Sequence, residues 1–213
     1  MSARPATPRA VIFDLGGVVV DSPLHAIAAY ELELGIPAGF VNRLVVETGS
    51  GGAWSRMERG EIDMATFYDE FEKECATGGH PLSAVAMMER IGECGPRPAM
   101  LRAIGLLREA GLLVAALTNN WAAEGAAPDA PHEFQDLFHV VIESSKVGLR
   151  KPDPRIYQLA CRELSIRPSE AIFLDDIGRN LKAARALGMH TIKVDAPEPA
   201  LAALSEATGL SLV

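Results

Sequence analysis

The stretch AVIFDLGGVVVDS, residues 10–22, decides the fold of this chain. Its first four residues are apolar and include two β-branched side chains, which is typical of a buried strand, and the run ends on Asp14. Gly16 and Gly17 follow at once and let the backbone approach a neighbour closely. Ligands of open α/β sheets bind beyond the carboxyl ends of the strands, so this pattern predicts a site next to Asp14.

Further along the chain, short apolar runs alternate with segments of helical periodicity. This alternation favours a parallel sheet with helices on both faces. The expected strands cover residues 9–15, 112–120, 138–145, 170–176 and 190–195, and the expected helices cover 100–111, 152–166 and 178–189.

Between Pro23 and Gly95 the pattern is helical with turn-like breaks, and it contains no convincing strand. The sequence therefore predicts an α/β fold, a Rossmann-like, doubly wound parallel sheet core with an inserted small all-helical cap domain. We expect the core to span 8–21 and 97–213, and the cap to span 22–96. The Ala- and Pro-rich segment 121–134 is expected to form a flexible loop.

Composition narrows the function. A net charge of −8 over 213 residues argues against a general nucleic-acid binder, because phosphate backbones are held by clusters of Lys and Arg. The three cysteines show no spacing typical of a zinc site or a disulfide framework, so a buried apolar role is expected for each. The start of the chain lacks the apolar core of a signal peptide, and no stretch reaches transmembrane length. We expect a cytoplasmic protein without a membrane partner, and the oligomeric state stays open.

Polar side chains stand where four of the expected strands end, or in the loop that follows. A single acid at a strand end is often a helix cap, but three acids, a hydroxyl, an amide and a lysine form a pattern that is harder to dismiss. These residues are Asp14, Thr118, Asn119, Lys151, Asp175 and Asp176.

Three neighbouring carboxylates repel one another unless a cation neutralises them. Mg²⁺ is bound by one or two carboxylates together with waters and a substrate phosphate. Lys151, Thr118 and Asn119 would then hold the other phosphate oxygens. Asp14 is the expected nucleophile, attacking phosphorus to form an aspartyl-phosphate.

Four segments together resemble the motifs of the haloacid dehalogenase-like (HAD) superfamily of hydrolases. They are VIFDLGGVVVD (11–21), LTNN (117–120), GLRKPDPRIY (148–157) and IFLDDIGRNLKAARALGM (172–189). The resemblance covers essentially the whole chain and is nearest to the phosphatase-like N-terminal domain of soluble epoxide hydrolases and its bacterial relatives.

The resemblance implies a phosphatase that acts on a small phosphorylated metabolite with Mg²⁺ as cofactor. It implies that Asp14 is nucleophile and metal ligand, and that Thr118 and Lys151 hold the phosphate. Asp175 and Asp176 would form the acidic metal pair, with Asp176 the more direct ligand, and the carbonyl of Gly16 would face the metal.

Gly16 departs from the family pattern, in which phosphatases usually carry a second Asp two residues after the nucleophile. That Asp protonates the leaving group, a role worth roughly 10²- to 10⁴-fold in rate. Three explanations stay open: another group supplies the proton, the substrate has a good leaving group, or the chain is a weak enzyme that mainly binds. The candidate substitutes are Asp21, His25, Glu58 and Glu61.

Rival functions are weaker. A haloacid dehalogenase needs no metal, so the retained acidic pair counts against it. A receiver domain carries its acidic pair early in the chain, whereas Asp175 and Asp176 come late, and no GxGxxG opens a helix for a dinucleotide. The serious alternative is a catalytically degenerate module that binds a phosphoryl ligand or a protein. Substrate choice is expected to depend on the insert, where Trp54, Arg56 and Tyr68 are the first residues to inspect. Trp121 either lines the pocket entrance or covers the sheet edge, and both interpretations stay open.

Overall fold

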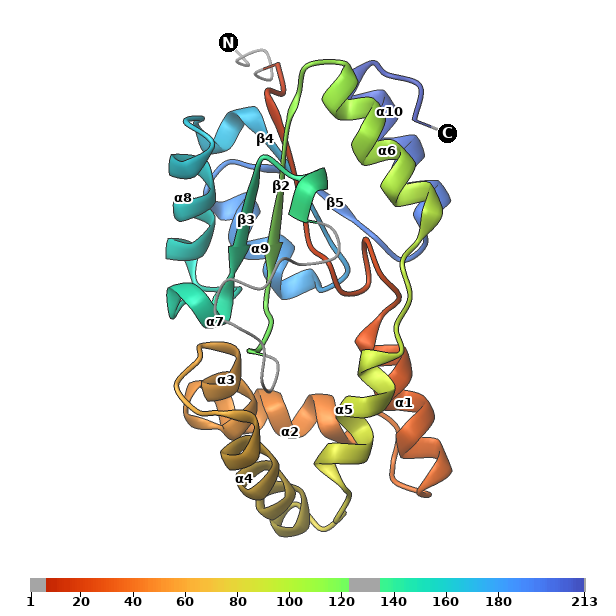
Figure 1. Cartoon of the computed structure of the whole chain (residues 1–213), viewed down its shortest axis with the longest axis vertical. Coiled ribbons are helices and arrows are strands. Elements are labelled where there is room, and N and C mark those ends of the chain that lie inside the picture. Colours follow the sequence, from red (N-terminus) through yellow and green to blue (C-terminus); the bar gives the residue numbers. More distant parts are fainter. Residues whose placement is uncertain (1–6, 123–134, 213) are drawn as a thin grey trace.

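The structure is a computed structural model that describes residues 7–122 and 135–212. The loop predicted for 121–134 therefore lies almost entirely outside the described residues. A five-stranded, fully parallel sheet occupies the centre of the molecule, in the order β3-β2-β1-β4-β5 (Figure 1). The strands are β1 (Ala10–Phe13), β2 (Leu113–Thr118), β3 (Val140–Glu143), β4 (Ala171–Asp175) and β5 (His190–Lys193).

Alternation along β1 divides the core between two faces of this sheet. Val11 and Phe13 point into one apolar cluster, and Ala10 and Ile12 point into another. The first cluster is covered by α6 (Pro98–Glu109) and α10 (Pro197–Thr208), and the second by α8 (Pro154–Glu163) and α9 (Gly178–Ala186). Because both faces are buried, β1 is apolar throughout, and the predicted Rossmann-like α/β fold is confirmed.

The insert between β1 and α6 is helical and lies beyond the carboxyl ends of the strands (Figure 1). Its core is a third apolar cluster, in which Trp54 packs edge-on against Phe67 and Phe71 with ring centroids 5.7 and 5.6 Å apart. Within the described residues, its strand-like features are two isolated bridges at its base, from Val20 to Gly16 and from Val20 to Pro96. Its helices are α1 (Pro23–Glu33), α2 (Phe40–Thr48), α3 (Ala53–Glu58), α4 (Met64–Thr77) and α5 (Ala84–Gly92), with the short 3₁₀ turn η1 (Gly49–Gly51).

Several details differ from the sequence predictions. The strand expected over 138–145 ends at Glu143, because Ser144 begins the short helix α7 (Ser144–Val147) and its hydroxyl accepts a bond from the backbone N–H of Asn120 at 2.9 Å. The helix α10 was not predicted. Cys75 and Cys161 are buried, whereas Cys94 is only half-buried.

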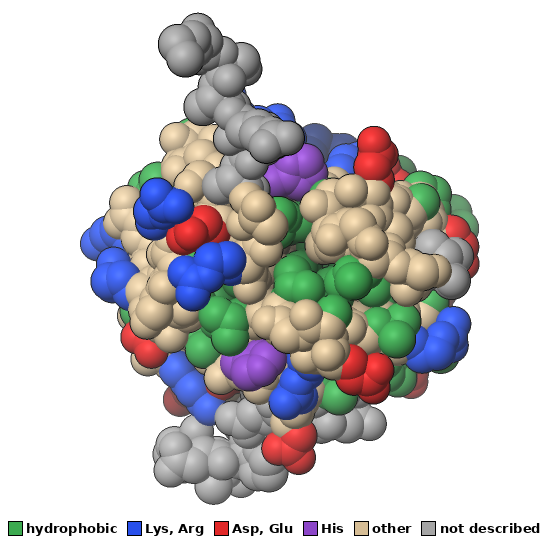
Figure 2. Space-filling model, turned by 90° about the horizontal axis from the view of Figure 1, so that it is seen from above, with side chains coloured by type: hydrophobic (Ala, Val, Ile, Leu, Met, Phe, Trp, Pro, Cys, Tyr) green, Lys and Arg blue, Asp and Glu red, His purple; other side chains and the backbone are tan. Residues whose placement is uncertain are grey.

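The end of the molecule away from the insert carries interspersed positive and negative side chains (Figure 2). This face therefore offers no broad basic surface of the kind that holds a phosphate backbone. Among the described residues, no helix has both the length and the apolar character to cross a bilayer.

Candidate active site

The fold brings the predicted acids together at the carboxyl end of the sheet. Asp14 follows β1, Asp175 ends β4, and Asp176 comes next, so that one oxygen from each carboxylate lies within 4.8 Å of the others. The Nζ atom of Lys151 lies 2.7 Å from Asp14 Oδ1 and 2.8 Å from Asp175 Oδ2. Residues separated by up to 162 positions in sequence, the span from 14 to 176, thus share one small site.

Burial sets the electrostatics of this cluster. Lys151 and Asp175 are almost fully buried, and Asp14 is 7% exposed. Burial raises the pKa of Asp14 well above its ordinary value; Lys151 opposes this shift, while Asp175 and Asp176 add to it. Burial alone would lower the pKa of Lys151, but the charges of Asp14 and Asp175 raise it. One ammonium is therefore too little positive charge for three clustered carboxylates.

The two acids of the pair differ in how many partners they have. Asp175 accepts hydrogen bonds from Lys151 Nζ and from the backbone N–H of Ile177. Asn180 Nδ2 also donates to both of its carboxylate oxygens, each at 3.1 Å. Within the described residues, Asp176 accepts one bond from another residue, the Ser22 hydroxyl at 3.1 Å. Asn180 Oδ1 is buried and has no hydrogen-bond partner in the described part of the chain. Free carboxylate lone pairs and a buried acceptor are what a hydrated, oxygen-preferring cation needs, so the donor set fits Mg²⁺.

Two glycines shape the wall beside this cluster. Gly16 lines the cavity above the acids. Gly17 has a φ of 77°, and a Cβ on it would overlap the carboxylate of Asp176. The chain therefore needs glycine at 17 both for its backbone conformation and for the position of Asp176.

Thr118 ends β2 and Asn119 follows it, and their side chains have different partners. Thr118 is buried at the strand end, and its hydroxyl lies 3.4 Å from the Asn119 carbonyl oxygen. Asn119 Oδ1 accepts from the Lys151 N–H at 2.8 Å, and Asn119 Nδ2 donates to the Lys151 carbonyl at 3.1 Å. The Asn119 side chain thus fixes the loop that carries Lys151, and its expected contact with phosphate stays a prediction.

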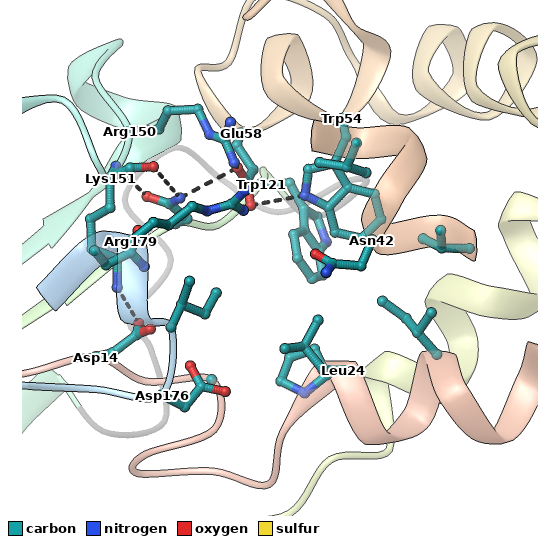
Figure 3. Close-up of a pocket in the computed structure, with 18 residues that line it drawn as sticks. Asp14, Leu24, Asn42, Trp54, Glu58, Trp121, Arg150, Lys151, Asp176 and Arg179 are labelled. Carbon is teal, nitrogen blue, oxygen red and sulfur yellow. Dashed lines mark hydrogen bonds and ion pairs between the residues drawn. The ribbon is translucent and has the colours of Figure 1, made fainter. Parts of the chain in front are cut away.

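A cavity of about 110 Å³ lies between this cluster and the insert (Figure 3). Its apolar wall comes mainly from the insert and from Trp121, and its polar side carries Glu58, Arg150 and Arg179. The apolar wall consists of Pro23, Leu24, Ile27, Val41, Val45, Trp54, Trp121 and Ile177.

The structure separates the candidates for the missing acid. Asp21 is exposed and pairs with Arg97 at 3.3 Å outside this cavity. His25 lines a different hollow, on the other side of Asp176. The exposed Glu61 is held by Arg59 through two bonds of 2.6 and 2.8 Å.

Glu58 is the one candidate of the four that lines the cavity with Asp14. Burial raises its pKa, and Arg150 opposes the shift. Its carboxylate accepts from Trp54 Nε1 at 3.0 Å, from the Arg150 guanidinium and from Asn119 Nδ2 at 3.4 Å. These contacts oppose the shift that burial causes, and they tie the Glu58 carboxylate to the loop that carries Lys151, so Glu58 anchors the insert on that loop.

Other sequence candidates have structural partners. Arg56 pairs with Glu70, and it does not line the cavity. Tyr68 packs beside Phe67 in the helical cluster, with ring centroids 5.8 Å apart. Sequence reasoning did not single out Arg150, Arg179 or Asn180, although they adjoin the motif residues Lys151 and Asp176; proximity to those motifs was the available signal.

Fold and site together define a Rossmann-like α/β protein with clustered carboxylates at the strand ends. The chain belongs to the haloacid dehalogenase-like hydrolase family, whose model matches residues 8–188.

Similar proteins include phosphatases and multidomain enzymes. The chain is 41% identical to acyl-CoA dehydrogenase family member 10 of Mus musculus and 34% identical to bifunctional epoxide hydrolase 2 of Sus scrofa, in each case over 96% of its own length. It spans only 19% and 40% of those two proteins. A sesquiterpene phosphatase of Aspergillus oryzae is 28% identical over 86% of this chain and 88% of its own.

Solved structures share the fold. A predicted HAD-like hydrolase of Porphyromonas gingivalis aligns with a TM-score of 0.63 at 21% identity, covering 94% of this chain and 98% of its own. A HAD-family enzyme of Bacteroides thetaiotaomicron, in complex with magnesium and inorganic phosphate, aligns with a TM-score of 0.59 at 22% identity, covering 89% and 96%.

Proposed function

We propose that the chain is a Mg²⁺-dependent phosphatase that acts on a small phosphorylated metabolite through an aspartyl-phosphate on Asp14. The observation that carries this proposal is the convergence of Asp14, Asp175 and Asp176 around Lys151, at the floor of a cavity. The phosphatases among the similar proteins support it.

In the proposed reaction, an Asp14 oxygen forms a bond to phosphorus while the bond from phosphorus to the leaving oxygen breaks. The leaving oxygen departs with the electron pair. Water then attacks the phosphorus of the aspartyl-phosphate, which releases inorganic phosphate and restores the Asp14 carboxylate. Lys151 and Thr118 would donate to phosphate oxygens, and Asn119 would hold Lys151 in place.

Asp14, Asp176 and the carbonyl of Gly16 would hold Mg²⁺, with Asp175 nearby. When bound, Mg²⁺ supplies positive charge that offsets the carboxylates and the phosphoryl oxygens. Lys151 already balances part of this charge through Asp14 and Asp175.

Gly16 has a direct consequence for the substrate. Among the four candidate substitutes, Glu58 alone lines the cavity, and its carboxylate is already engaged by Trp54 and Arg150, so we assign it no role as proton donor. A leaving group that needs little protonation, such as an aryl or acyl phosphate, then reacts faster than an alkyl ester. The apolar wall with Trp54 and Trp121 is suited to a hydrophobic leaving group.

The test is turnover of 4-nitrophenyl phosphate with and without Mg²⁺. We expect activity that requires Mg²⁺ and that Asp14→Asn abolishes, whereas the matched variant Asp69→Asn on the exposed side of α4 is unaffected. Absence of turnover in the presence of Mg²⁺, with phosphate binding retained, would instead support the binding module.

Leaving-group dependence tests the role of Gly16. Across a series of aryl and alkyl phosphates, kcat/KM is expected to fall steeply as the leaving group becomes more basic. A flat series would show that another residue supplies the proton. Gly16→Asp is expected to make kcat/KM depend less on the leaving group. This substitution should be combined with Pro23→Ala to make room for it, because a Cβ at residue 16 would lie 3.1 Å from the Pro23 ring.

A further inference from the structure

A second cavity adjoins the proposed active site. It measures about 420 Å³ and shares three lining residues with the first cavity: Val45, Arg150 and Arg179. The shared residues place it directly beside the space that holds the reacting phosphoryl group. Its lining contains four arginines and a single acid, although the whole chain has a net charge of −8.

Most of these arginines are already paired. Arg155 bonds Asp153 at 2.6 Å, and Arg59 bonds Glu61 at 2.6 Å. Arg150 pairs with Glu58 and donates to Ser55 at 2.8 Å. These three arginines line the cavity, and the carboxylates they pair with largely balance their charges.

Arg179 is different. It is exposed and lines both cavities, and it has neither a carboxylate partner nor a hydrogen bond in the described residues. In Figure 3 its side chain reaches toward the same cavity as Lys151 and Glu58. A cation at the second position of α9 is also unfavourable for the helix dipole, so the chain gains no local stability from it.

Arg150 supplies a second, independent observation. Its Nε atom is buried and donates to nothing in the part of the chain that the structure describes. A buried donor without an acceptor is costly, and the side chain that carries it lines both cavities. Arg150 and Arg179 therefore offer an unsatisfied donor and an unpaired charge at the junction of the two cavities.

We propose that this junction binds a second anionic group of the substrate, a carboxylate or a phosphate, carried on the part that leaves with the alcohol oxygen. The proposal rests on the proposed phosphatase function. Between the two anionic ends, the substrate would lie along the apolar wall that includes Val45 and Trp54. The substrate class is thus a phosphomonoester with an apolar body and a further acidic group.

The experiment uses aryl phosphates that carry a carboxylate on tethers of increasing length, each compared with its methyl ester. For one tether length, kcat/KM for the acid is expected to exceed that for the ester by roughly 10- to 100-fold, the value of one or two charged hydrogen bonds. In Arg179→Ala this ratio falls to near one, and Arg179→Lys keeps part of it. The matched control Arg162→Ala, on an exposed position of α8 outside both cavities, keeps the wild-type ratio.

Two outcomes would overturn the proposal: a ratio near one in the wild type at every tether length, or an equal loss for acid and ester in Arg179→Ala. The second would place Arg179 on the transferred phosphoryl group. The acid-to-ester ratio can also be measured without turnover, as a ratio of calorimetric binding constants. The proteins compared are Asp14→Asn and the double variant Asp14→Asn with Arg179→Ala. If no aryl phosphate is hydrolysed yet the acid still binds more tightly than its ester, the phosphatase function fails and the anion subsite stands.

Discussion

Replacing Lys151 by Met is expected to destabilise the protein far more than the loss of a surface charge. The side chain is 1% exposed, and its Nζ atom pairs with Asp14 at 2.7 Å and with Asp175 at 2.8 Å. Methionine keeps the apolar stem but leaves two buried carboxylates without their cation. Removing one partner of a buried ion pair costs about 3–5 kcal/mol, and full burial means that solvent screening does not reduce this figure here.

The loss should depend on pH in a stated direction. Burial and the neighbouring acids already raise the pKa of Asp14 above its ordinary value of 3.8, and loss of Lys151 raises it further. A carboxyl with a raised folded-state pKa contributes stability below its ordinary value, and that stability is lost as pH rises through the folded value. The gap between wild type and Lys151→Met should therefore be smallest near pH 4 and widest at neutral pH.

The assay is urea unfolding in the presence of a chelator, at acid and at neutral pH, with Lys182→Met as the control on an exposed position of α9. Lys182→Met is expected to change the free energy of unfolding by less than about 0.5 kcal/mol. Adding Asp175→Asn to Lys151→Met should recover part of the lost stability, because one unpaired charge is removed. A loss below about 1 kcal/mol, or an equal loss at both pH values, would refute the account of the buried pairs.

Three further substitutions test separate features. Gly17→Ala should abolish Mg²⁺ binding measured by calorimetry, because the new Cβ overlaps the Asp176 carboxylate; unchanged affinity would exclude Asp176 as a ligand. Phe71→Ala should cost about 3–5 kcal/mol in urea unfolding, because its ring is fully buried in the insert, and a loss under about 1 kcal/mol would contradict that packing. Gly60→Ala should cost at least about 1 kcal/mol, because Gly60 has a φ of 67° and touches the Ser145 backbone; an unchanged midpoint would place the insert farther from α7.

The sheet could be predicted because the apolar sequence of its strands agrees with their burial in the fold. Strands buried on both faces are continuous apolar runs, and β1 and β4 are read directly from AVIF and AIFLD. The acids at their ends also share one edge by topology alone, so the Asp14, Asp175 and Asp176 cluster followed from strand order. The helix α10 was missed because its weakly amphipathic, Ala-rich sequence gives little periodic signal.

The rest of the site depends on contacts between segments that are far apart in the sequence, for which sequence periodicity carries no information. Nothing local in the sequence shows that Glu58 pairs with Arg150, or that the Asn119 amide bonds both the N–H and the carbonyl of Lys151. Those partners are 92 and 32 positions apart. The packing of separate helices therefore decided which of the four candidate acids reached the cavity.

Charge balance links the acid cluster, the cation and the anionic substrate. Three carboxylates and the Lys151 ammonium leave two negative charges in a largely buried site, and a phosphate dianion would be repelled from it. A divalent cation brings the cluster to neutrality, after which phosphate adds two negative charges that Lys151, Thr118 and the cation can share. In the proposed reaction, the cation therefore binds before phosphate binds tightly. Arg179 lies outside this balance, since the acids do not contact it, and its charge stays available to the other end of the substrate.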